Sequence, residues 1–547
     1  MPTRPLDHTR APAPGGHTVG RWVSASARLA PGRIAVDERG RLLTYRELDD
    51  RSSALAEALR AAGYRRGDRV ATLTRSSTDH VVAFFACAKA ALVLAPLSWR
   101  LAGAELADLV AHCRPALLLA SAELEGAARA AASASPTPPP LALLGPDGVE
   151  SAVPARGASV GPAGADAPTP DDDEPRTPDD EPPGASVPAD EDPVLLLYTS
   201  GSTGRPRGVL LTHANCYWTN ASLGDATGMT SQDVVLGIMP QFHSGGWNVQ
   251  PLLAWRTGAT VVLEPDFDPG AVIDLLSRRR VTTMMGVPAH YRMLAEHPDF
   301  ASADLHGLTH AIVGGAPMPH DLLAVWQSRG VRVFQGYGLT EAAPNVLVLP
   351  AEEAGDHVGS VGRPYAHVEV ALLTGGEVHH GAGTGELLVR GPAVFAGYAD
   401  DPEATRAAFH DGWLRTGDLA ERDDAGYVRI VDRRSAMYIT GGENVSPAQV
   451  ESVLRAHPGI ADVAVVGVPD TDWGEVGHAV VVARPGADLD ARSVVAHARE
   501  SLAAYKCPRY VTFVDELPRI TLLKVDRARL PLPSGDPVGP RETRSDA

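Results

Sequence analysis

The sequence has 547 residues, 44% of them hydrophobic and 21% charged, with a formal net charge of −18. This length is too great for a single hydrophobic core and predicts roughly three or four folding units, while the composition excludes a fibrous or wholly disordered chain. The acidic balance also argues against nucleic acid as a partner, because phosphate backbones are bound by clustered Lys and Arg.

Cysteine spacing and the length of apolar segments indicate the cellular location of the protein. The four cysteines are scattered without a CxxC or metal-type spacing, which predicts buried, reduced thiols and a cytoplasmic location; they are Cys87, Cys113, Cys216 and Cys507. The amino-terminal residues lack the apolar core of a secretory signal. The longest apolar stretch, Val81–Leu97, contains Lys89 and is short for a membrane span, so we expect none.

The first part of the chain is predicted to alternate between helices and strands after a disordered lead-in. Residues 1–18 are rich in Pro and Gly and show no periodicity. A Thr44-capped amphipathic helix is predicted to end at Gly63, and a strand, Arg69–Leu73, follows it. Further short apolar strands at Ala91–Ala95 and Ala116–Ala120 indicate βα units and mostly parallel sheets.

A low-complexity segment interrupts this alternation. Residues 151–192 are rich in Pro, Gly, Ser, Ala and acidic residues, and eleven acidic residues fall within Asp166–Asp192. Such a segment buries too little apolar surface to offset its ordering entropy, so we predict a flexible acidic insert. An acidic docking site for a partner is the alternative interpretation.

Beyond the insert the pattern divides into three parts. The apolar run Val194–Tyr198 predicts a buried strand, and βα alternation continues from Val234 to Phe334. Residues 359–430 have shorter strands, such as Val368–Leu373 and Glu386–Val389, and more turns, which indicates a β-rich subdomain. From Asp432 a small α+β domain is predicted, with helices at Pro447–Ala456 and Ala491–Ser501 and strands at Val463–Val468 and Ala479–Ala483.

The predicted fold class is therefore α/β, with a large N-terminal domain of parallel βα sheets plus a β-rich subdomain, and a small α+β C-terminal domain. The expected boundaries are a disordered N-terminus at 1–18, the large domain at 19–431 with the insert at 151–192, and the small domain at 432–547.

The segment Tyr198–Val209 carries the strongest chemical signal. Four aliphatic hydroxyls, three glycines and two arginines directly follow a buried strand. Glycines let the backbone approach an anion, hydroxyl and N–H groups donate to phosphate oxygens, and arginine neutralises charge. We therefore predict a polyphosphate-binding turn, although a flexible Gly/Ser turn is the alternative; no GxxxxGK[ST] element of an ordinary P-loop occurs. Its candidate residues are Thr199, Ser200, Gly201, Ser202, Thr203, Gly204 and Arg207.

This turn resembles the signature loop of the adenylate-forming superfamily, which includes acyl-CoA synthetases, aryl-CoA ligases, luciferases and peptide-synthetase adenylation domains. The resemblance runs from about Arg21 to about Leu530, with the acidic insert as its one large interruption. It implies ATP, Mg²⁺ and coenzyme A as cofactors, and a small C-terminal domain that is mobile. Where the family's loop usually has lysine this chain has Arg207, which keeps the charge and is still expected to hold phosphate.

Other motifs recur in the family's order and imply a nucleotide site. In the segment Gln335–Glu341, the resemblance places Tyr337 on adenine, Thr340 at the α-phosphate and Glu341 on magnesium. Gln335, Gly336 and Gly338 belong to the same nucleotide-binding segment. Asp418 resembles the aspartate that accepts hydrogen bonds from both ribose hydroxyls. The turn Gly314–Pro317 implies adenine contacts from Gly315, Ala316 and Pro317, with Gly314 in the wall of the acid pocket.

The segment Phe242–Trp247 resembles the family's link between the nucleotide and acid sites. It implies that His243 lies beside the reacting carboxylate and that Gly245, Gly246 and Trp247 form the acid pocket, although His243 could equally be structural. Amino-acid-activating relatives usually place an aspartate near here to pair with the substrate ammonium. Its absence favours an unaminated acid, such as a fatty, aryl or other hydrophobic acid.

In the small domain, the resemblance implies that Arg433 reaches ribose and phosphate at the hinge. It also implies that Lys524 bridges the carboxylate oxygen and the α-phosphate, a task suited to a compact charge on a long stem. Gly441 and Gly442 resemble the face that admits the pantetheine arm of coenzyme A. Three positions depart from the family's pattern, Ser435 and Ala436 at the hinge and Leu523 before the lysine.

The function these motifs predict is a ligase that converts a carboxylic acid to its acyl-adenylate, releases pyrophosphate and transfers the acyl group to coenzyme A. The three departures motivate one alternative, in which the chain only adenylates and passes acyl-AMP to an acyl carrier protein or a partner enzyme. An inactive scaffold of the same fold is the alternative from another class.

Overall fold

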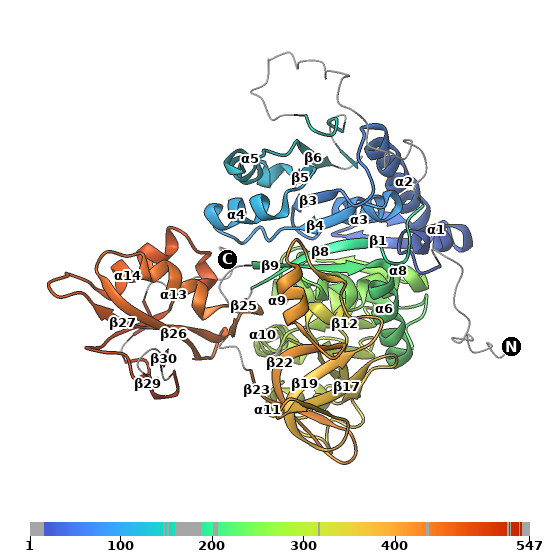
Figure 1. Ribbon diagram of the computed structural model, residues 1–547. Coiled ribbons are helices and arrows are strands. Elements are labelled where there is room, and N and C mark those ends of the chain that lie inside the picture. The colour runs from blue at the N-terminus through green and yellow to red at the C-terminus, as the bar shows by residue number, and fades with distance from the viewer. Residues whose placement is uncertain are drawn as a thin grey trace.

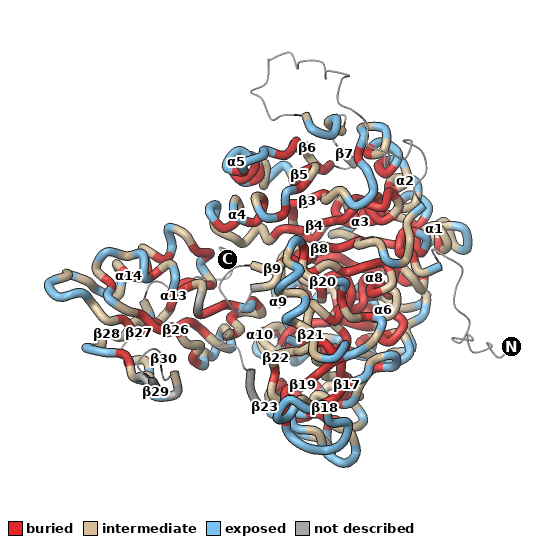
Figure 2. The backbone as a smooth tube through the Cα atoms, viewed as in Figure 1, coloured by how far each residue is buried: buried red, intermediate tan, exposed pale blue. Residues whose placement is uncertain are grey.

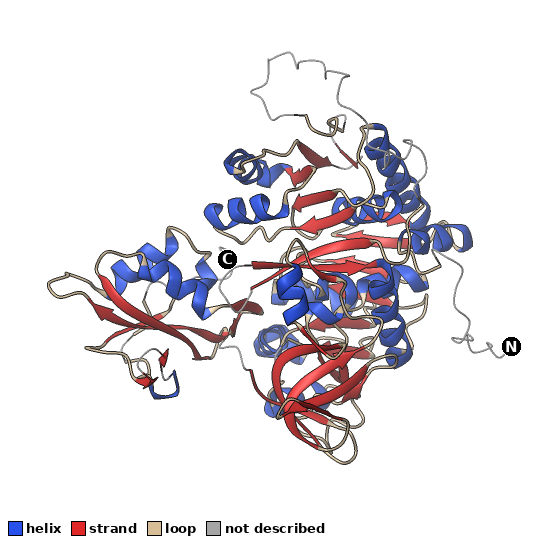
Figure 3. Cartoon of the chain, in the orientation of Figure 1, coloured by secondary structure: helices blue, strands red, loops and turns tan. Residues whose placement is uncertain are grey.

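The computed structural model describes residues 16–145, 148–149, 153–158, 187–200, 206–315, 318–433, 437–521, 524–525, 527–534 and 536–538. Residues 1–15 of the predicted disordered N-terminus and residues 151–152 and 159–186 of the predicted insert lie outside the described residues. The described chain forms two large sheets, a β-rich unit and a small C-terminal unit (Figure 1, Figure 3).

The first large sheet carries the predicted phosphate-binding strand. Its order is β20-β9-β8-β4-β3-β5-β6-β7. The bounds are β3 (Arg69–Leu73), β4 (Val93–Pro96), β5 (Leu117–Ser121), β6 (Leu141–Gly145), β7 (Gly148–Val149), β8 (Pro193–Ser200), β9 (Pro206–Thr212) and β20 (Gly397–Tyr398). The strands from β8 to β6 pair in parallel, whereas β9 folds back antiparallel on β8. The β8–β9 hairpin thus brings both flanks of the phosphate-binding turn to one edge of the site.

The second large sheet has the order β16-β15-β14-β13-β12-β10-β11-β1-β2. Its bounds are β1 (Ile34–Glu38), β2 (Arg41–Thr44), β10 (Val234–Gly237), β11 (Thr260–Leu263), β12 (Thr283–Gly286), β13 (His310–Val313), β14 (Val333–Tyr337), β15 (Leu347–Leu349) and β16 (Arg363–Pro364). The strands β1, β11, β10, β12, β13 and β14 are parallel. Parallel strands end at one edge of a sheet, which is where ligands of such sheets bind.

The helices arrange these sheets into five layers. α3 (Thr78–Ala90) and α8 (Pro251–Thr257) contribute to one core that both sheets share, together with α1 (Gly20–Leu29) and α2 (Tyr45–Ala61). α4 (Gly103–Cys113) and α5 (Glu125–Ala134) cover the outer face of the first sheet. α9 (Pro269–Arg278), α10 (Pro288–Glu296) and α11 (His320–Ser328) cover that of the second. Figure 2 shows the buried residues concentrated along the central strands.

The β-rich unit and the small unit follow in the chain. The β-rich unit contains β17 (Glu369–Thr374), β18 (Glu377–His379), β19 (Gly383–Arg390), β21 (Phe409–His410), β22 (Trp413–Arg422) and β23 (Val428–Arg433), all antiparallel. The small unit contains β24 (Tyr438–Thr440), β25 (Glu443–Val445), α13 (Pro447–Arg455), β26 (Ile460–Asp470), β27 (Gly474–Ala483), α14 (Ala491–Arg499), β28 (Tyr510–Phe513), β29 (Arg519–Thr521) and β30 (Lys524–Val525). Shorter helices are α6 (His213–Thr227), α7 (Gly245–Asn248) and α12 (Pro402–Ala407). The predicted fold class is confirmed.

Local sequence signals explain several of these elements. Thr44 caps α2, because its side chain accepts from Glu47 N while Glu47 Oε2 accepts from Thr44 N at 2.7 Å. The apolar stretch Val81–Leu97 forms α3 and β4, which are buried within the protein. No helix among the described residues is long and apolar enough to cross a membrane.

Residues at the edges of the segments predicted to be disordered contact the large domain or one another. Arg156 pairs with Asp68 at 2.7 Å, and Asp192 pairs with Arg66 at 2.6 Å, so both described ends of the predicted insert are held against the large domain. His17, within the predicted disordered N-terminus, donates its backbone N–H to Asp190 at 2.9 Å. The composition of these segments could not reveal these anchors, because each ion pair joins residues far apart in the sequence.

Candidate active site

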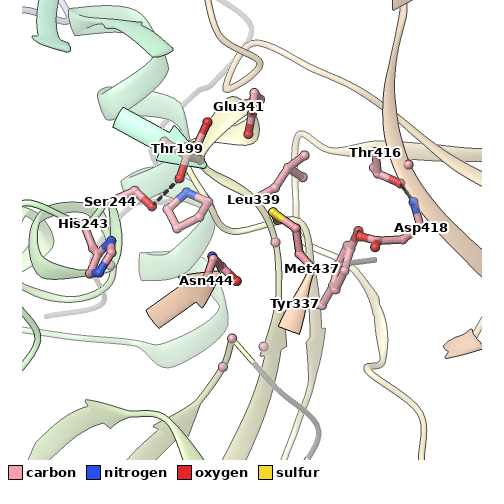
Figure 4. A pocket seen from close by; sticks show the side chains of 18 of the residues that line it. Thr199, His243, Ser244, Tyr337, Leu339, Glu341, Thr416, Asp418, Met437 and Asn444 are labelled. Atoms are coloured by element: carbon pink, nitrogen blue, oxygen red, sulfur yellow. Dashed lines mark hydrogen bonds between the residues drawn. The ribbon is translucent and has the colours of Figure 1, made fainter. Parts of the chain in front are cut away.

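A cavity of about 780 Å³ collects residues from both large sheets, the β-rich unit and the small unit. Figure 4 shows Tyr337 and Asp418 on one side of it and His243 and Ser244 on the other. The predicted residues that line the cavity are Thr199, Arg207, His243, Gly245, Gly314, Gly315, Gly336, Tyr337, Gly338, Thr340, Glu341, Asp418 and Gly442. Motifs spread over some 240 residues of sequence, from Thr199 to Gly442, therefore meet at one place.

The end of the cavity that is predicted to bind phosphate lies at the β8–β9 hairpin. Thr199 and Arg207 face each other across this antiparallel pair and both line the cavity. The intervening Gly201, Ser202, Thr203 and Gly204 lie outside the described residues, and the side chain of Ser200 is not described either. The Arg207 guanidinium lies 5.2 Å from the ring centroid of Tyr398, so it is held on an aromatic face.

Glu341 is the carboxylate at this end. It lies in a short 3-10 helix, Thr340–Ala342, and accepts a hydrogen bond from the Tyr398 hydroxyl at 2.9 Å. Burial raises the pKa of Glu341, while the bond from Tyr398 and the charge of Arg207 oppose that rise. No group of three metal-ligating side chains occurs in the described part of the chain. A single carboxylate fits Mg²⁺, which usually takes one or two carboxylates and completes its shell with substrate phosphates and water.

The residues predicted to bind the nucleoside lie between β14 and β22. The Tyr337 hydroxyl donates to Asp418 Oδ2 at 2.6 Å, and Asp418 N donates to Thr416 Oγ1 at 3.1 Å. Glu386 accepts from Gly417 N at 3.2 Å and so fixes the turn that carries Asp418. A Cβ on Gly338 would lie 1.3 Å from Pro344 O, so only glycine allows this chain crossing.

The part of the cavity that is predicted to bind the acid is apolar. Gly245 and Gly314 lie here beside a wall of hydrophobic side chains, namely Met239, Val249, Met285, Ile312 and Tyr365. A Cβ on Gly245 would meet Met285 Cε at 3.7 Å and Met239 Cε at 3.9 Å, which are ordinary contact distances. No Asp or Glu belongs to the described residues of this wall, so nothing there would pair with a substrate ammonium.

Among the fully described predicted residues, four do not line this cavity: Gly246, Trp247, Gln335 and Gly441. Trp247 is fully buried, stacks on Phe84 at 4.5 Å and donates to Gln241 O, so its prediction as a pocket wall is wrong. The reason is helical geometry: residues 245 and 247 are two apart in α7, so they lie on different faces of this helix. Gly246 is needed for packing instead, since a Cβ there would lie 2.2 Å from Pro240 O. Gln335 lies in β14 outside the cavity lining.

His243 contacts the small unit. Its Nε2 lies 2.8 Å from Glu443 Oε2, and Arg100 Nη1 donates to Glu443 Oε1 at 2.8 Å. Burial alone raises the pKa of Glu443, but the charges of His243 and Arg100 and their hydrogen bonds outweigh it and lower the pKa to about 2. A charged carboxylate of the small unit is thus held between two groups of the large domain.

The small unit presents its β24–β25 turn to the cavity. Gly442 lines the cavity with Met437 and Asn444, whereas Gly441 lies behind it, where a Cβ would meet the Trp473 ring at 2.6 Å. Figure 1 shows β25 on the side of the small unit that faces the large domain, and the β29–β30 hairpin on another side, beyond β26. The backbone of Lys524 belongs to that hairpin, and Arg433 ends β23. Their side chains, and Ser435, Ala436, Leu523, Ala316 and Pro317, lie outside the described residues.

Sequence reasoning gave no role to several charged or hydroxylated residues of the site, among them Arg100, Glu386, Tyr398 and Glu443. Glu443 follows the predicted Gly441–Gly442 turn directly, and a charged residue at that position was a usable signal. The other three lie in segments without a motif, and their partners are distant in the sequence.

Comparison with known proteins agrees with this geometry. The sequence model of the AMP-binding enzyme family matches residues 23–399, and that of the AMP-binding enzyme C-terminal domain matches residues 449–523. A feruloyl-CoA synthase from an Amycolatopsis species is 40% identical over 501 residues, which are 91% of this chain and 96% of that protein.

Two structures of o-succinylbenzoate CoA synthetase from Bacillus subtilis match this chain over nearly its whole length. A double mutant bound with the product analogue OSB-NCoA is 29% identical, with a TM-score of 0.80 over 93% of this chain and 98% of that one. The complex of the same protein with ATP and magnesium ion is also 29% identical, but has a TM-score of 0.66 over 93% of this chain and 97% of that one. Identity and coverage are nearly equal, and by TM-score this chain superposes more closely on the product-analogue complex. By the extent and position of these matches, the predicted membership of the adenylate-forming superfamily is confirmed, and the chain belongs to the AMP-binding enzyme family.

Proposed function

We propose that the chain is an AMP-forming acid–thiol ligase that uses ATP and Mg²⁺ to activate an unaminated, hydrophobic carboxylic acid and then transfers the acyl group to coenzyme A. One observation carries the proposal. A single cavity joins the Tyr337–Asp418 pair, the Glu341 carboxylate and an apolar wall, and Gly442 of the small unit also lines it. Such a cavity brings an acid and a nucleotide into reacting distance and excludes water.

In the first step an oxygen of the acid attacks the α-phosphorus of ATP in line, and pyrophosphate leaves with the electrons of the broken P–O bond. Tyr337 and Asp418 hold the nucleoside, and Thr199 and Arg207 contact the phosphates. Glu341 would hold Mg²⁺, which would supply positive charge to offset that of the phosphates. We propose that Lys524 stabilises the charge that develops between the acid oxygen and the α-phosphate.

In the second step the sulfur of coenzyme A attacks the acyl carbon, the thiol proton is released and AMP leaves. We propose that the small unit turns between the steps, so that the β29–β30 hairpin serves adenylation and the β24–β25 turn serves transfer. The arrangement described here has the second face inward. Gly442 then leaves room for the pantetheine arm beside His243.

The experiment that tests the first step is acid-dependent exchange of radiolabelled pyrophosphate into ATP. Fatty, aryl and other unaminated acids should support exchange, and amino acids should not. The variant Lys524→Ala should lose exchange by about a hundredfold or more, while ATP binding persists. Unchanged exchange in this variant would remove Lys524 from the mechanism, and no exchange with any acid would favour an inactive scaffold.

The departures from the family's pattern at Ser435, Ala436 and Leu523 motivate a second proposal for the acceptor of the acyl group. We propose as the alternative that acyl-AMP passes to an acyl carrier protein or a partner enzyme. Parallel assays with coenzyme A and with a holo-carrier protein would decide between the two acceptors. A cytoplasmic location is also proposed, supported by the four free, buried cysteines; recovery in a membrane or extracellular fraction would contradict it.

A further inference from the structure

The small unit docks on a short segment of the large domain, residues 98–105, where α4 begins. Glu105, the third residue of α4, is only 9% exposed. Its carboxylate accepts from the Lys506 ammonium at 2.5 Å, from Ala503 N at 2.8 Å and from Gln449 Nε2 at 3.0 Å. All three donors belong to the small unit. One carboxylate of the large domain therefore accepts three hydrogen bonds that exist only in the docked arrangement.

Lys506 is as deeply buried as its partner. Its side chain is 8% exposed, and the carboxylate of Glu105 is the ion partner recorded for it. A buried ion pair that loses one member leaves an uncompensated buried charge, which is far more costly than losing a pair on the surface. If the small unit turns away, both groups return to water. The ion pair therefore stabilises the docked arrangement and no other.

A second ion pair of opposite polarity lies next to the first. On the same large-domain segment, Arg100 pairs with Glu443 of the small unit at 2.8 Å. The large domain thus offers a cation and an anion five residues apart, and the small unit offers an anion and a cation to match. A docking shifted or rotated from this one would bring like charges together, so the two pairs together specify one orientation.

We propose that Glu105 and Lys506 are positioning residues for the transfer half-reaction, because their ion pair selects the arrangement in which the Gly442 turn closes the acid cavity. The inference rests on the proposed function, in which transfer follows adenylation. Neither residue lines the cavity. Their loss should therefore spare adenylation, which the docked arrangement does not serve, and slow transfer to coenzyme A.

The test separates the half-reactions in the full chain with four variants: Glu105→Gln, Lys506→Met, the double variant, and Glu125→Gln as a matched control. Glu125 forms an exposed helix pair with Arg129 on the neighbouring α5. Single-turnover transfer from acyl-AMP to coenzyme A should slow about tenfold or more in each single variant. The double variant should be less impaired than the product of the two single effects, because it leaves no lone buried charge. Pyrophosphate exchange should stay within about twofold of the parent, which also shows that each variant is folded.

Three outcomes would overturn the proposal: unchanged transfer in both single variants, equal loss in both half-reactions, or independent effects in the double variant. If Glu105→Gln does not fold, Lys506→Met is judged by the same criteria.

A readout independent of activity separates this proposal from the proposed function. Spin labels at the exposed positions Asp108→Cys on α4 and Arg492→Cys on α14 report the docking distance, and the four native cysteines are buried. The short-distance population should fall in Glu105→Gln and Lys506→Met and recover in part in the double variant. An unchanged distribution would overturn the inference even if the parent transfers its acyl group to a thiol other than coenzyme A. Failure of the parent to form any thioester, with the distances shifting as described, would instead count against the proposed function alone.

Discussion

Replacing Glu443 with Gln should impair acyl transfer without impairing adenylation. In the docked arrangement, His243 and Arg100 outweigh the effect of burial and lower the pKa of this carboxyl from 4.5 to about 2. A shift of that size corresponds to about 3 kcal/mol in favour of the docked, charged form, or about a hundredfold in its population. Because the pKa is lowered on docking, this stabilisation is complete above pH 4.5 and is lost only as the pH falls through about 2. At neutral pH the part contributed by Arg100 is therefore present, and the part contributed by the charge of His243 requires the protonated imidazole.

The assay follows acyl-AMP and acyl-CoA by rapid quench after coenzyme A is added to the preformed adenylate. Glu443→Gln should slow this step by about a hundredfold at most, since glutamine keeps part of the hydrogen bonding. Pyrophosphate exchange should be unchanged. The matched control is Glu500→Gln, because the Glu500 side chain is 73% exposed and pairs with His497 within the small unit. Transfer at the parent rate in Glu443→Gln, or equal slowing in the control, would refute the reasoning.

The other predictions concern metal binding, the acid pocket and acid stability. Tyr398→Phe removes the hydroxyl that donates to Glu341, so the Mg²⁺ concentration needed for half-maximal exchange should rise about tenfold; an unchanged Mg²⁺ dependence would contradict this role. Gly245→Ala adds a methyl group at ordinary contact distance and should leave a folded enzyme that favours smaller acids. Gly246→Ala places Cβ 2.2 Å from a backbone oxygen and should abolish folded protein. Kinetics with a panel of acids and the yield of folded protein would check both variants, and equal behaviour of the two would refute the geometry. Burial lowers the pKa of His80 to about 4, so the contribution of His80 to stability is complete above pH 6.5 and falls by about 2 kcal/mol by pH 5. Thermal unfolding should therefore depend less on pH in His80→Gln than in the parent. Parallel pH profiles of the unfolding temperature in the two proteins would contradict this prediction.

Local signals in the sequence predicted the elements well. The Thr44–Glu47 capping box, the strand at Arg69–Leu73 and the buried strand before the phosphate-binding turn all occur where propensity and periodicity placed them. These features depend on neighbours within a few residues, which a sequence displays directly. The resemblance then predicted most of the residues that line the cavity, because motifs such as the segment ending at Glu341 keep their local shape.

What the sequence could not predict depends on contacts between distant segments. The direction of Trp247 is set by the core beneath α7, and α7 itself is only four residues long. Glu105 and Lys506 are 401 residues apart, and neither belongs to a motif. Which face of the small unit lies inward could not be predicted either, since both the lysine hairpin and the glycine turn are present in the sequence. The arrangement is decided by the summed ion pairs and packing across the boundary.

The central claim is that one chain joins an acid to a thiol by way of an adenylate. The most direct measurement is a single time course that quantifies ATP, AMP, pyrophosphate, acyl-AMP and acyl-CoA with a panel of unaminated acids, first without and then with coenzyme A. The account predicts acid-dependent acyl-AMP that is consumed when coenzyme A is added, with one AMP released for each acyl-CoA formed. Release of ADP, or acyl-AMP that persists in the presence of coenzyme A, would contradict it.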